Sequence, residues 1–320
     1  GVVLMENAGL RIVRALRGRF SDPAAERIVV VAGKGNNGGD GFVVARHLFN
    51  EGVRPEVLLL ASVAEVGGDA ATNLAVARGM GIPVTEVRDA AAWKKVRIKV
   101  MHASVLVDAI FGTGLVRPLD GLHALAVEDI NRARAFTMAV DIPSGLSSDS
   151  FETAGPSVEA DLTVALAAPK IAHIFPPAAD RVGELVVAPI GIPPALLERP
   201  ELKLELVEEG IVRPFFAPRR KDSHKGTFGH VLIVAGSVGK SGAAALAGRA
   251  ALRMGVGLVT VAVPAGVLPS VARTMAELMT EPLAGTPQGT VAAEALPRAL
   301  GLLGGKNAVL VGPGLSTNPA

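Results

Sequence analysis

Short aliphatic runs alternate with longer amphipathic segments along the first half of the chain. The aliphatic runs predict strands, and the segments between them predict helices. Such alternation is typical of a parallel sheet with right-handed crossovers, because parallel strands must be joined by a long connection. We therefore predict an α/β fold with a Rossmann-like, doubly wound, mostly parallel sheet. The predicted strands are residues 27–32, 55–61, 82–87, 105–110, 136–142, 162–166 and 184–190, and the predicted helices include 41–50, 69–80 and 121–134.

A stretch rich in proline and charge, residues 193–225, interrupts this alternation and is the best domain boundary. We predict one domain over residues 1–200 and a second over residues 201–320. About three strands are too few to close a good α/β core, so we expect the second domain to be incomplete. Residue 1 already lies in a helical pattern, so we expect the natural N-terminus to lie upstream. The second domain has predicted strands at 230–235, 258–263 and 308–311, a helix at 241–255, and helices near 267–276 and 291–303.

Composition narrows the class of protein. Hydrophobic residues make up 49% of the chain and aromatic residues 3%, so Ala, Val, Leu and Ile must fill the core. Cysteine is absent, which excludes disulfides, thiolate metal sites and cysteine nucleophiles. The apolar runs stop short of the roughly 20 residues that a membrane span needs. The one compact basic run, residues 219–221, lacks an aromatic platform and is interpreted as a solvated linker, not a nucleic-acid site. We expect a cytoplasmic protein.

The richest motif is GKGNNGGDG at residues 33–41, between a predicted strand and a predicted helix. Gly33, Gly35 and Gly38 fit G-x-G-x-x-G, the spacing that lets a pyrophosphate approach a helix N-terminus. A nicotinamide dehydrogenase also needs an acidic residue at the end of the second strand, where this chain has Ala and Ser. Asn36 and Asn37 add amide oxygens that a phosphate turn does not need. A glycine turn without a ligand is the structural alternative.

Two more polar clusters follow predicted strands. Asp108 leads into a glycine-rich loop with Thr113 and Arg117, and Asp141 and Ser144 follow another strand. Strand carboxyl ends meet at one edge of a parallel sheet, where ligands of open α/β sheets bind. Carboxylate, amide and hydroxyl oxygens there suit a hard cation, and a carboxylate can also act as general acid or base. Capping of the following turn is the alternative role for Asp108. The six histidines show no zinc-like spacing and are expected at the surface or at caps.

In the second half, residues 236–241 (GSVGKS) resemble a phosphate-binding loop but fail its template, because Val234 stands where the first glycine belongs. This argues against a P-loop nucleotidase. The strand–turn–helix there is still a fair site for the approach of an anion or nucleotide.

These strings together resemble the bifunctional NAD(P)H-hydrate repair family, over nearly the whole chain. The first half is similar to the epimerase domain, with LMENAG at 4–9, AGKGNNGGDGFVVARHL at 32–48, DAIFGTGLVRPLDG at 108–121 and DIPSGL at 141–146. The second half is similar to the opening of the dehydratase domain, with HKGTFGHVLIVAGSVGKSGAAALAGRAALRMGVGLVTV at 224–261 and VGPGL at 311–315. The resemblance implies a ribokinase-like fold for that half.

The resemblance also implies activities and roles. An epimerase of this family interconverts the R and S hydrates of NADH and NADPH, and the dehydratase restores the S form with ADP or ATP. Asp141 would be the acid/base residue, and Asn37, Asp108 and Ser144 would hold a potassium ion. The residues implied to contact the hydrate are Asn36, Asn37, Gly38, Gly39, Asp40, Gly112, Thr113, Gly114, Leu115, Val116, Arg117, Pro118, Asp141, Ala243 and Gly314.

The dehydratase's nucleotide-binding loop and catalytic Asp are expected beyond Ala320, together with any magnesium that accompanies the nucleotide. A homo-oligomer is also expected. Three other interpretations stay open: a nicotinamide dehydrogenase, a ribokinase-like small-molecule kinase, and a non-catalytic binding module on an epimerase-like fold. The motif at 33–41 argues against the first, and intact Asp108, Asp141 and Ser144 argue against the last.

Overall fold

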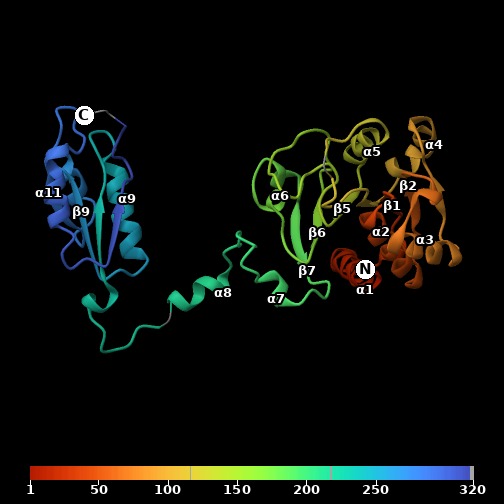
Figure 1. Ribbon diagram of the computed structural model, residues 1–320, viewed down its shortest axis with the longest axis horizontal. Helices are drawn as coiled ribbons and strands as arrows, with labels where there is room; N and C mark the ends of the chain where they lie inside the picture. The colour runs from red at the N-terminus through yellow and green to blue at the C-terminus, as the bar shows by residue number, and fades with distance from the viewer. Residues whose placement is uncertain (116, 217, 318–320) are drawn as a thin grey trace. The chain divides into compact units, whose positions relative to one another are not determined.

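The chain folds as two compact units, Gly1–Glu205 and Leu206–Ala320. The computed structural model describes residues 1–115, 117–216 and 218–317. Each unit contains a parallel sheet flanked by helices (Figure 1). The predicted α/β class is confirmed. The division between the units falls within the proline-rich stretch, which holds only short helical turns such as α7 (Pro194–Leu197) and α8 (Glu209–Val212).

The sheet of the first unit has the order β3-β2-β1-β4-β5-β6-β7, and all its strand pairs are parallel. From β1 the chain first adds β2 and β3 on one side and then crosses to add β4 to β7 on the other, so β1 lies between β2 and β4. This reversal makes a doubly wound sheet with a crevice beyond the carboxyl ends of β1 and β4. Each predicted strand of this half forms, as β1 (Ile28–Ala32), β2 (Glu56–Leu59), β3 (Val84–Glu86), β4 (Val105–Ala109), β5 (Phe136–Val140), β6 (Leu162–Leu166) and β7 (Glu184–Ala188).

Helices cover both faces of this sheet. α1 (Val2–Arg19), α2 (Asn36–Asn50) and α3 (Gly68–Gly79) pack on one face, and α4 (Ala90–Met101) and α5 (Gly121–Arg132) pack on the other. α2 begins at Asn36, earlier than the predicted start at residue 41, because the glycine-rich segment itself forms the first turn. The start of α2 therefore lies directly against the sheet end.

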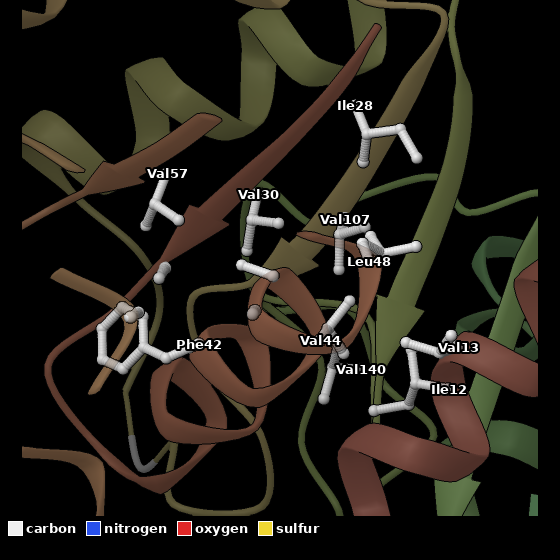
Figure 2. Close-up of a cluster of buried hydrophobic side chains, with 14 of the residues drawn as sticks. Ile12, Val13, Ile28, Val30, Phe42, Val44, Leu48, Val57, Val107 and Val140 are labelled. Atoms are coloured by element: carbon white, nitrogen blue, oxygen red, sulfur yellow. The ribbon is translucent and has the colours of Figure 1, made fainter. Parts of the chain in front are cut away.

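Side chains along the central strands alternate between the two faces. Val30 points toward α2 and α1, whereas Val29 and Val31 belong to the cluster under α4 and α5. Figure 2 shows the first cluster, with Val44 and Leu48 of α2 directed at the strands. Burial on both faces explains why the strands are continuous aliphatic runs.

The second unit contains a sheet with the order β10-β9-β8-β11, all parallel. Three of these strands match the sequence prediction: β8 (His230–Val234), β9 (Leu258–Pro264) and β11 (Ala308–Val311). β10 (Met279–Leu283) was not predicted, because Glu281 and Pro282 break its aliphatic pattern. A proline is tolerated there because β10 lies at the edge of the sheet.

The helices of the second unit are α9 (Ser241–Arg253), α10 (Leu268–Ala272) and α11 (Leu296–Gly301). α10 and α11 are shorter than predicted, and each has proline near its start, where a missing N–H costs least. None of the helices among the described residues is long and apolar enough to cross a bilayer.

Gly41→Ala tests the close packing of α2 on the sheet. A Cβ there would lie 2.6 Å from the Ala109 Cβ and 3.1 Å from the Val30 Cγ1. We expect the free energy of unfolding of the first unit to fall by about 1–3 kcal/mol, the usual range for overpacking. Gly18→Ala is the matched control, since nothing lies within 4 Å of its added Cβ on α1. It should raise stability by about 0.5–1 kcal/mol. Equal effects of the two changes in urea denaturation would contradict this packing.

Candidate active site

Polar side chains of the first unit follow β1, β4 and β5 at the carboxyl ends of these strands. The segment after β1 opens α2, Asp108 lies on β4, and Asp141 and Ser144 follow β5. This is the position at which open α/β sheets bind ligands.

Two of the three glycines of the G-x-G-x-x-G string serve the packing of the chain. A Cβ on Gly33 would lie 2.1 Å from the Ile110 carbonyl oxygen, and one on Gly38 would lie 1.9 Å from the Gly33 oxygen. Nothing lies within 4 Å of a Cβ on Gly35, the residue that precedes α2. Gly33 and Gly38 are therefore required by the fold itself, and only Gly35 leaves open space for a ligand.

Asp108 and Ser144 form a closed, buried pair, and each is 0% exposed. The Ser144 hydroxyl donates to Asp108 Oδ1 at 2.6 Å, and the Ser144 N–H donates to Oδ2 at 2.8 Å. The Ser144 Oγ also lies 3.1 Å from the Phe111 carbonyl oxygen and accepts from the Phe111 N–H at 2.9 Å. Burial raises the pKa of Asp108 to about 6, although the hydrogen bonds from Ser144 and Ile110 act in the opposite direction. The pair ties the end of β4 to the loop after β5.

Asp141 is held by one of its two carboxylate oxygens. Its backbone is left-handed, with φ 67°, which turns the side chain at the strand end. Oδ1 accepts from the Leu166 N–H at 3.1 Å and forms an ion pair with Lys170 Nζ. Oδ2 lies 3.2 Å from the position that a Cβ on Gly112 would take. One oxygen is therefore fixed, and the other faces the glycine-rich loop.

Asn37 approaches the same point from α2. Its Oδ1 lies 3.0 Å from the Cβ position of Gly112, and its buried Nδ2 has no hydrogen-bond partner among the described residues. A buried amide without a partner is costly, so a site of this kind is suited to a polar ligand. Asn37 Oδ1 and Asp141 Oδ2 thus both lie close to Gly112, and a side chain at position 112 would crowd them.

Asp40 is the third buried carboxyl group of the region, with 7% of its surface exposed. Burial, and secondly the negative charge of Asp141, raises the pKa of Asp40 to about 8. At neutral pH, Asp40 is therefore mostly protonated and uncharged.

Two family models match the chain, one in each unit. The model of the YjeF-related protein N-terminus matches residues 1–172, more than half of the chain. The chain belongs to the YjeF-related family. The model of NAD(P)H-hydrate dehydratase matches residues 231–320. The resemblance to bifunctional NAD(P)H-hydrate repair enzymes is thereby confirmed.

Two curated relatives point the same way. A bifunctional NAD(P)H-hydrate repair enzyme of Moorella thermoacetica is 42% identical over 100% of this chain and 60% of its own length. One of Thermofilum pendens is 39% identical over 98% of this chain and 58% of its own. The chain thus spans about 60% of the length of these relatives. A solved ADP/ATP-dependent NAD(P)H-hydrate dehydratase from Bacillus subtilis, co-crystallised with ATP and Mg²⁺, is 26% identical with a TM-score of 0.26, covering 35% of this chain and 48% of that chain.

Sequence reasoning missed Lys170 and His173, which complete the surroundings of Asp141 in this YjeF-related unit. Besides its ion pair with Asp141, Lys170 Nζ donates to the Leu166 carbonyl oxygen at 2.9 Å. His173 caps α6 (Ile171–Ile174) by accepting from the Lys170 N–H at 3.0 Å. Burial and the charge of Lys170 lower the pKa of His173 to about 4, against an opposing effect of Asp141. Lys170 follows β6. A search for polar residues after every predicted strand, and not only after those that form β1, β4 and β5, would have found it.

The glycine-rich loop after β4 is the exposed wall of the region. Thr113, Gly114, Arg117 and Pro118 are exposed, Leu115 is half-buried, and the implied contact Val116 lies outside the described residues. At the start of this loop, the Phe111 ring packs edge-on against His123, with ring centroids 4.9 Å apart. The loop can therefore meet a ligand without rearrangement of the core.

The family string at residues 4–9 has a structural role. Glu6 on α1 forms ion pairs with Arg46 and with His47 of α2, the latter at 2.7 Å. Asn7 Nδ2 donates to the Ile190 carbonyl oxygen at 2.8 Å. These contacts fix α1 against α2 and the end of β7.

In the second unit, the implied hydrate contacts Ala243 and Gly314 lie side by side. A Cβ on Gly314 would lie 3.1 Å from the Ala243 Cβ. The Ser237 hydroxyl donates to the Gly314 carbonyl oxygen at 2.7 Å, which joins the loop after β8 to the loop after β11. Both loops follow neighbouring strands at the carboxyl ends of the sheet.

A cleft of about 500 Å³ lies elsewhere in the first unit, at the opposite ends of the strands. It is lined by Arg27, Arg54, Glu56, Lys99 and His102, among others. The Lys99 ammonium pairs with Glu56 across it. The cleft holds none of the residues implied by the family motifs, so its size alone does not make it the active site.

The raised pKa of Asp40 predicts a pH-dependent stability. Between pH 3.8, the ordinary value, and about 8, the folded unit keeps a proton that the unfolded chain releases. The free energy of unfolding should therefore fall as pH rises through this window. Asp40→Asn removes the titration, so it should raise the free energy of unfolding at pH 7 by about 1–4 kcal/mol and flatten its pH dependence.

Urea denaturation of both proteins at pH 5, 6, 7 and 8 measures this effect. Asp180→Asn, at an exposed position in the same unit, is the matched control and should change stability by less than about 0.5 kcal/mol. Parallel curves for the wild type and Asp40→Asn would contradict the assignment.

Proposed function

We propose that the first unit is an NAD(P)H-hydrate epimerase, which interconverts the R and S hydrates of NADH and NADPH. The observation that carries the proposal is Asp141, a buried carboxyl group with one oxygen fixed by Lys170 and the Leu166 N–H and the other close to Gly112. The relatives' names and the match of the YjeF-related model support it.

The arrangement suits acid/base work on a nicotinamide ring. Lys170 pairs with Asp141 Oδ1, so Oδ2 is the carboxylate oxygen that would take a proton. The hydrated ring would lie beside Gly112, within reach of Asp141 Oδ2. The pyrophosphate would then reach the first turn of α2 and the loop 112–118, where backbone N–H groups and Arg117 can receive it.

The oxygen atoms around Ser144 fit a monovalent cation. Ser144 Oγ, Asp108 Oδ1 and the Phe111 carbonyl oxygen lie together and share the single hydroxyl proton of Ser144. One carboxylate matches one positive charge, whereas divalent ions usually gather more carboxylates. Asp108 and Ser144, with the Asn37 amide, would hold a potassium ion. Such an ion would stabilise negative charge near the ring.

The second unit would contribute to an ADP- or ATP-dependent dehydratase acting on the S hydrate, with magnesium accompanying the nucleotide. Ala243 and Gly314 would contact the hydrate there. This part of the proposal rests on the dehydratase model that matches residues 231–320. A homo-oligomeric state and a cytoplasmic location stay predictions.

Asp141→Asn tests the acid/base role. The amide keeps the shape and cannot take the proton, so epimerisation above the spontaneous rate should fall by about 10²–10⁴. The assay is chromatographic separation of the R and S hydrates over time, without ADP or ATP. Asp180→Asn should keep the wild-type rate. Wild-type turnover by the Asp141 variant would remove this residue from the mechanism.

Potassium binding is tested by unfolding as well as by activity. An ion bound only by the folded unit should raise its free energy of unfolding by about 1.4 kcal/mol at ten times its Kd. Sodium at the same ionic strength should raise the free energy of unfolding less, because a smaller ion cannot contact all of the same oxygens equally well. Asp108→Asn should abolish the potassium effect. An equal response to both salts in the wild type would count against a specific site.

A further inference from the structure

The carboxyl ends of the neighbouring strands β5 and β6 each lead into a residue with a strained backbone. Asp141, directly after β5, has φ 67°, and Ala167, directly after β6, has φ 68°. Residues with a side chain rarely adopt this left-handed conformation. Such strain persists only where the surrounding contacts maintain it, and it is concentrated at functional sites. The contacts between these two strand ends therefore deserve a functional explanation.

The side chain of Asp141 takes part in the hydrogen-bond ladder between β5 and β6. The Asp141 N–H donates to the Val164 carbonyl oxygen at 2.9 Å, as in a regular parallel pair. A regular ladder would continue from the Leu166 N–H to the Asp141 carbonyl oxygen. Instead, the Leu166 N–H donates to Asp141 Oδ1 at 3.1 Å. The carboxyl group thus replaces a backbone acceptor, and this bond fixes Oδ1 at the end of the sheet.

Lys170 contacts both partners of that bond. Its Nζ forms an ion pair with Asp141 Oδ1 and donates to the Leu166 carbonyl oxygen at 2.9 Å. The side chain of Lys170 is 16% exposed and that of Asp141 is 11% exposed. A charge-assisted contact between mostly buried groups is stronger than one at the surface. Lys170 and the Leu166 peptide group therefore hold the same carboxylate oxygen.

His173 holds the backbone of Lys170 in turn. The ring of His173 is 5% exposed, and its Nδ1 accepts from the Lys170 N–H at 3.0 Å. A ring nitrogen that accepts this bond cannot carry a proton, so protonation at Nδ1 would break the contact. Burial, and secondly the charge of Lys170, lowers the pKa of His173 to about 4, so the ring is neutral near pH 7. The contact is therefore maintained at neutral pH.

We propose that Lys170 and His173 are positioning residues of the epimerase reaction, with His173 acting through Lys170 and Lys170 acting through Asp141. This inference rests on the epimerase function proposed above. Lys170 and the Leu166 N–H occupy Oδ1, which leaves Oδ2, the oxygen close to Gly112, to exchange a proton with the substrate. Without Lys170, the carboxyl group can rotate and spend part of its time in unproductive orientations. Misplacement of a reacting group lowers the rate of the chemical step.

This arrangement in series makes the contributions of the two positioning residues interdependent. A change at His173 should affect turnover only while Lys170 is present, because it acts through the placement of that side chain. Residues that act as a unit have strongly non-additive effects on rate. A residue that only stabilised the fold would lower the unfolding midpoint and leave kcat of the folded protein unchanged. Turnover and stability therefore separate the two roles.

The first test is Lys170→Met, which keeps an unbranched side chain and removes the charge. We expect kcat to fall by about 10–10²-fold with little change in KM, because the orientation of Asp141 is lost while the substrate contacts remain. Lys95→Met is the control, since Lys95 is exposed on α4 and makes no ion pair among the described residues. It should match the wild type. The unfolding midpoint shows whether each variant is folded, and Lys170→Gln is the alternative uncharged variant. An unchanged kcat in the folded variant would overturn the role of Lys170.

The second test is a double-mutant cycle of His173 and Lys170. His173→Leu removes the acceptor for the Lys170 N–H and should lower kcat about tenfold. His173→Asn places an amide oxygen near the position of Nδ1, so it should keep kcat within about threefold of the wild type. In the Lys170→Met background, His173→Leu should cause no further fall.

Equal losses in the two His173 variants, or a loss that adds in full to that of Lys170→Met, would overturn the role of His173. The same chromatographic assay of the R and S hydrates measures every variant. A wild type that does not interconvert the hydrates would instead overturn the epimerase function itself, and this result is seen before any variant is made.

Discussion

The first turn of α2 lies so close to β1 and β4 that side chains are excluded from the contact. Gly33, Gly38 and Gly41 would each place a Cβ within 2.6 Å of a neighbouring atom of the loop or of the sheet. Glycine weakens an isolated helix by about 1 kcal/mol per residue, so α2 cannot start at Asn36 on local preference alone. Packing on the sheet must compensate. The same closeness brings Asn37 and Asp40 to the strand ends, and the rest of the candidate site depends on it.

Once the strand ends are brought together, their three carboxyl groups differ only in their partners. Asp108 receives hydrogen bonds from Ser144 and Asp141 is paired with Lys170, whereas Asp40 has neither kind of partner among the described residues. Burial raises the pKa of Asp108 and of Asp40, and in Asp108 the hydrogen bonds from Ser144 oppose that effect. The fold therefore gives one residue type three different surroundings near one edge of the sheet.

Sequence reasoning reached the strands of the first unit because burial on both faces leaves an uninterrupted aliphatic run. It did not predict β10, because Pro282 interrupts the strand pattern and is tolerated only at the edge of the sheet. It also placed the start of α2 too late, because packing there overrides helix propensity. The strand-end rule predicted Asp108, Asp141 and Ser144. It could not predict the burial of Asp40, because that burial depends on how the first turn of α2 packs in the folded unit. Lys170 escaped because a turn after β6, and no periodic pattern, directs it to Asp141.

The family motifs of this chain have different roles: some place side chains in the candidate site, and others hold helices in position. The DIPSGL string supplies Asp141 and Ser144, which touch the candidate site directly. The LMENAG string contributes no side chain to that space, since Glu6 is bound by Arg46 and His47 and Asn7 by the Ile190 carbonyl. This string acts on the site indirectly, because it is part of α1 and α1 contacts α2. The position of α2 along the sheet determines how far its first turn extends beyond β1. A shift of α2 would move Asn37 and Asp40 together while Asp108, Asp141 and Ser144 stayed with their strands. The placement of Asn37 and Asp40 relative to the strand-end residues therefore depends on a helix–helix contact outside the site.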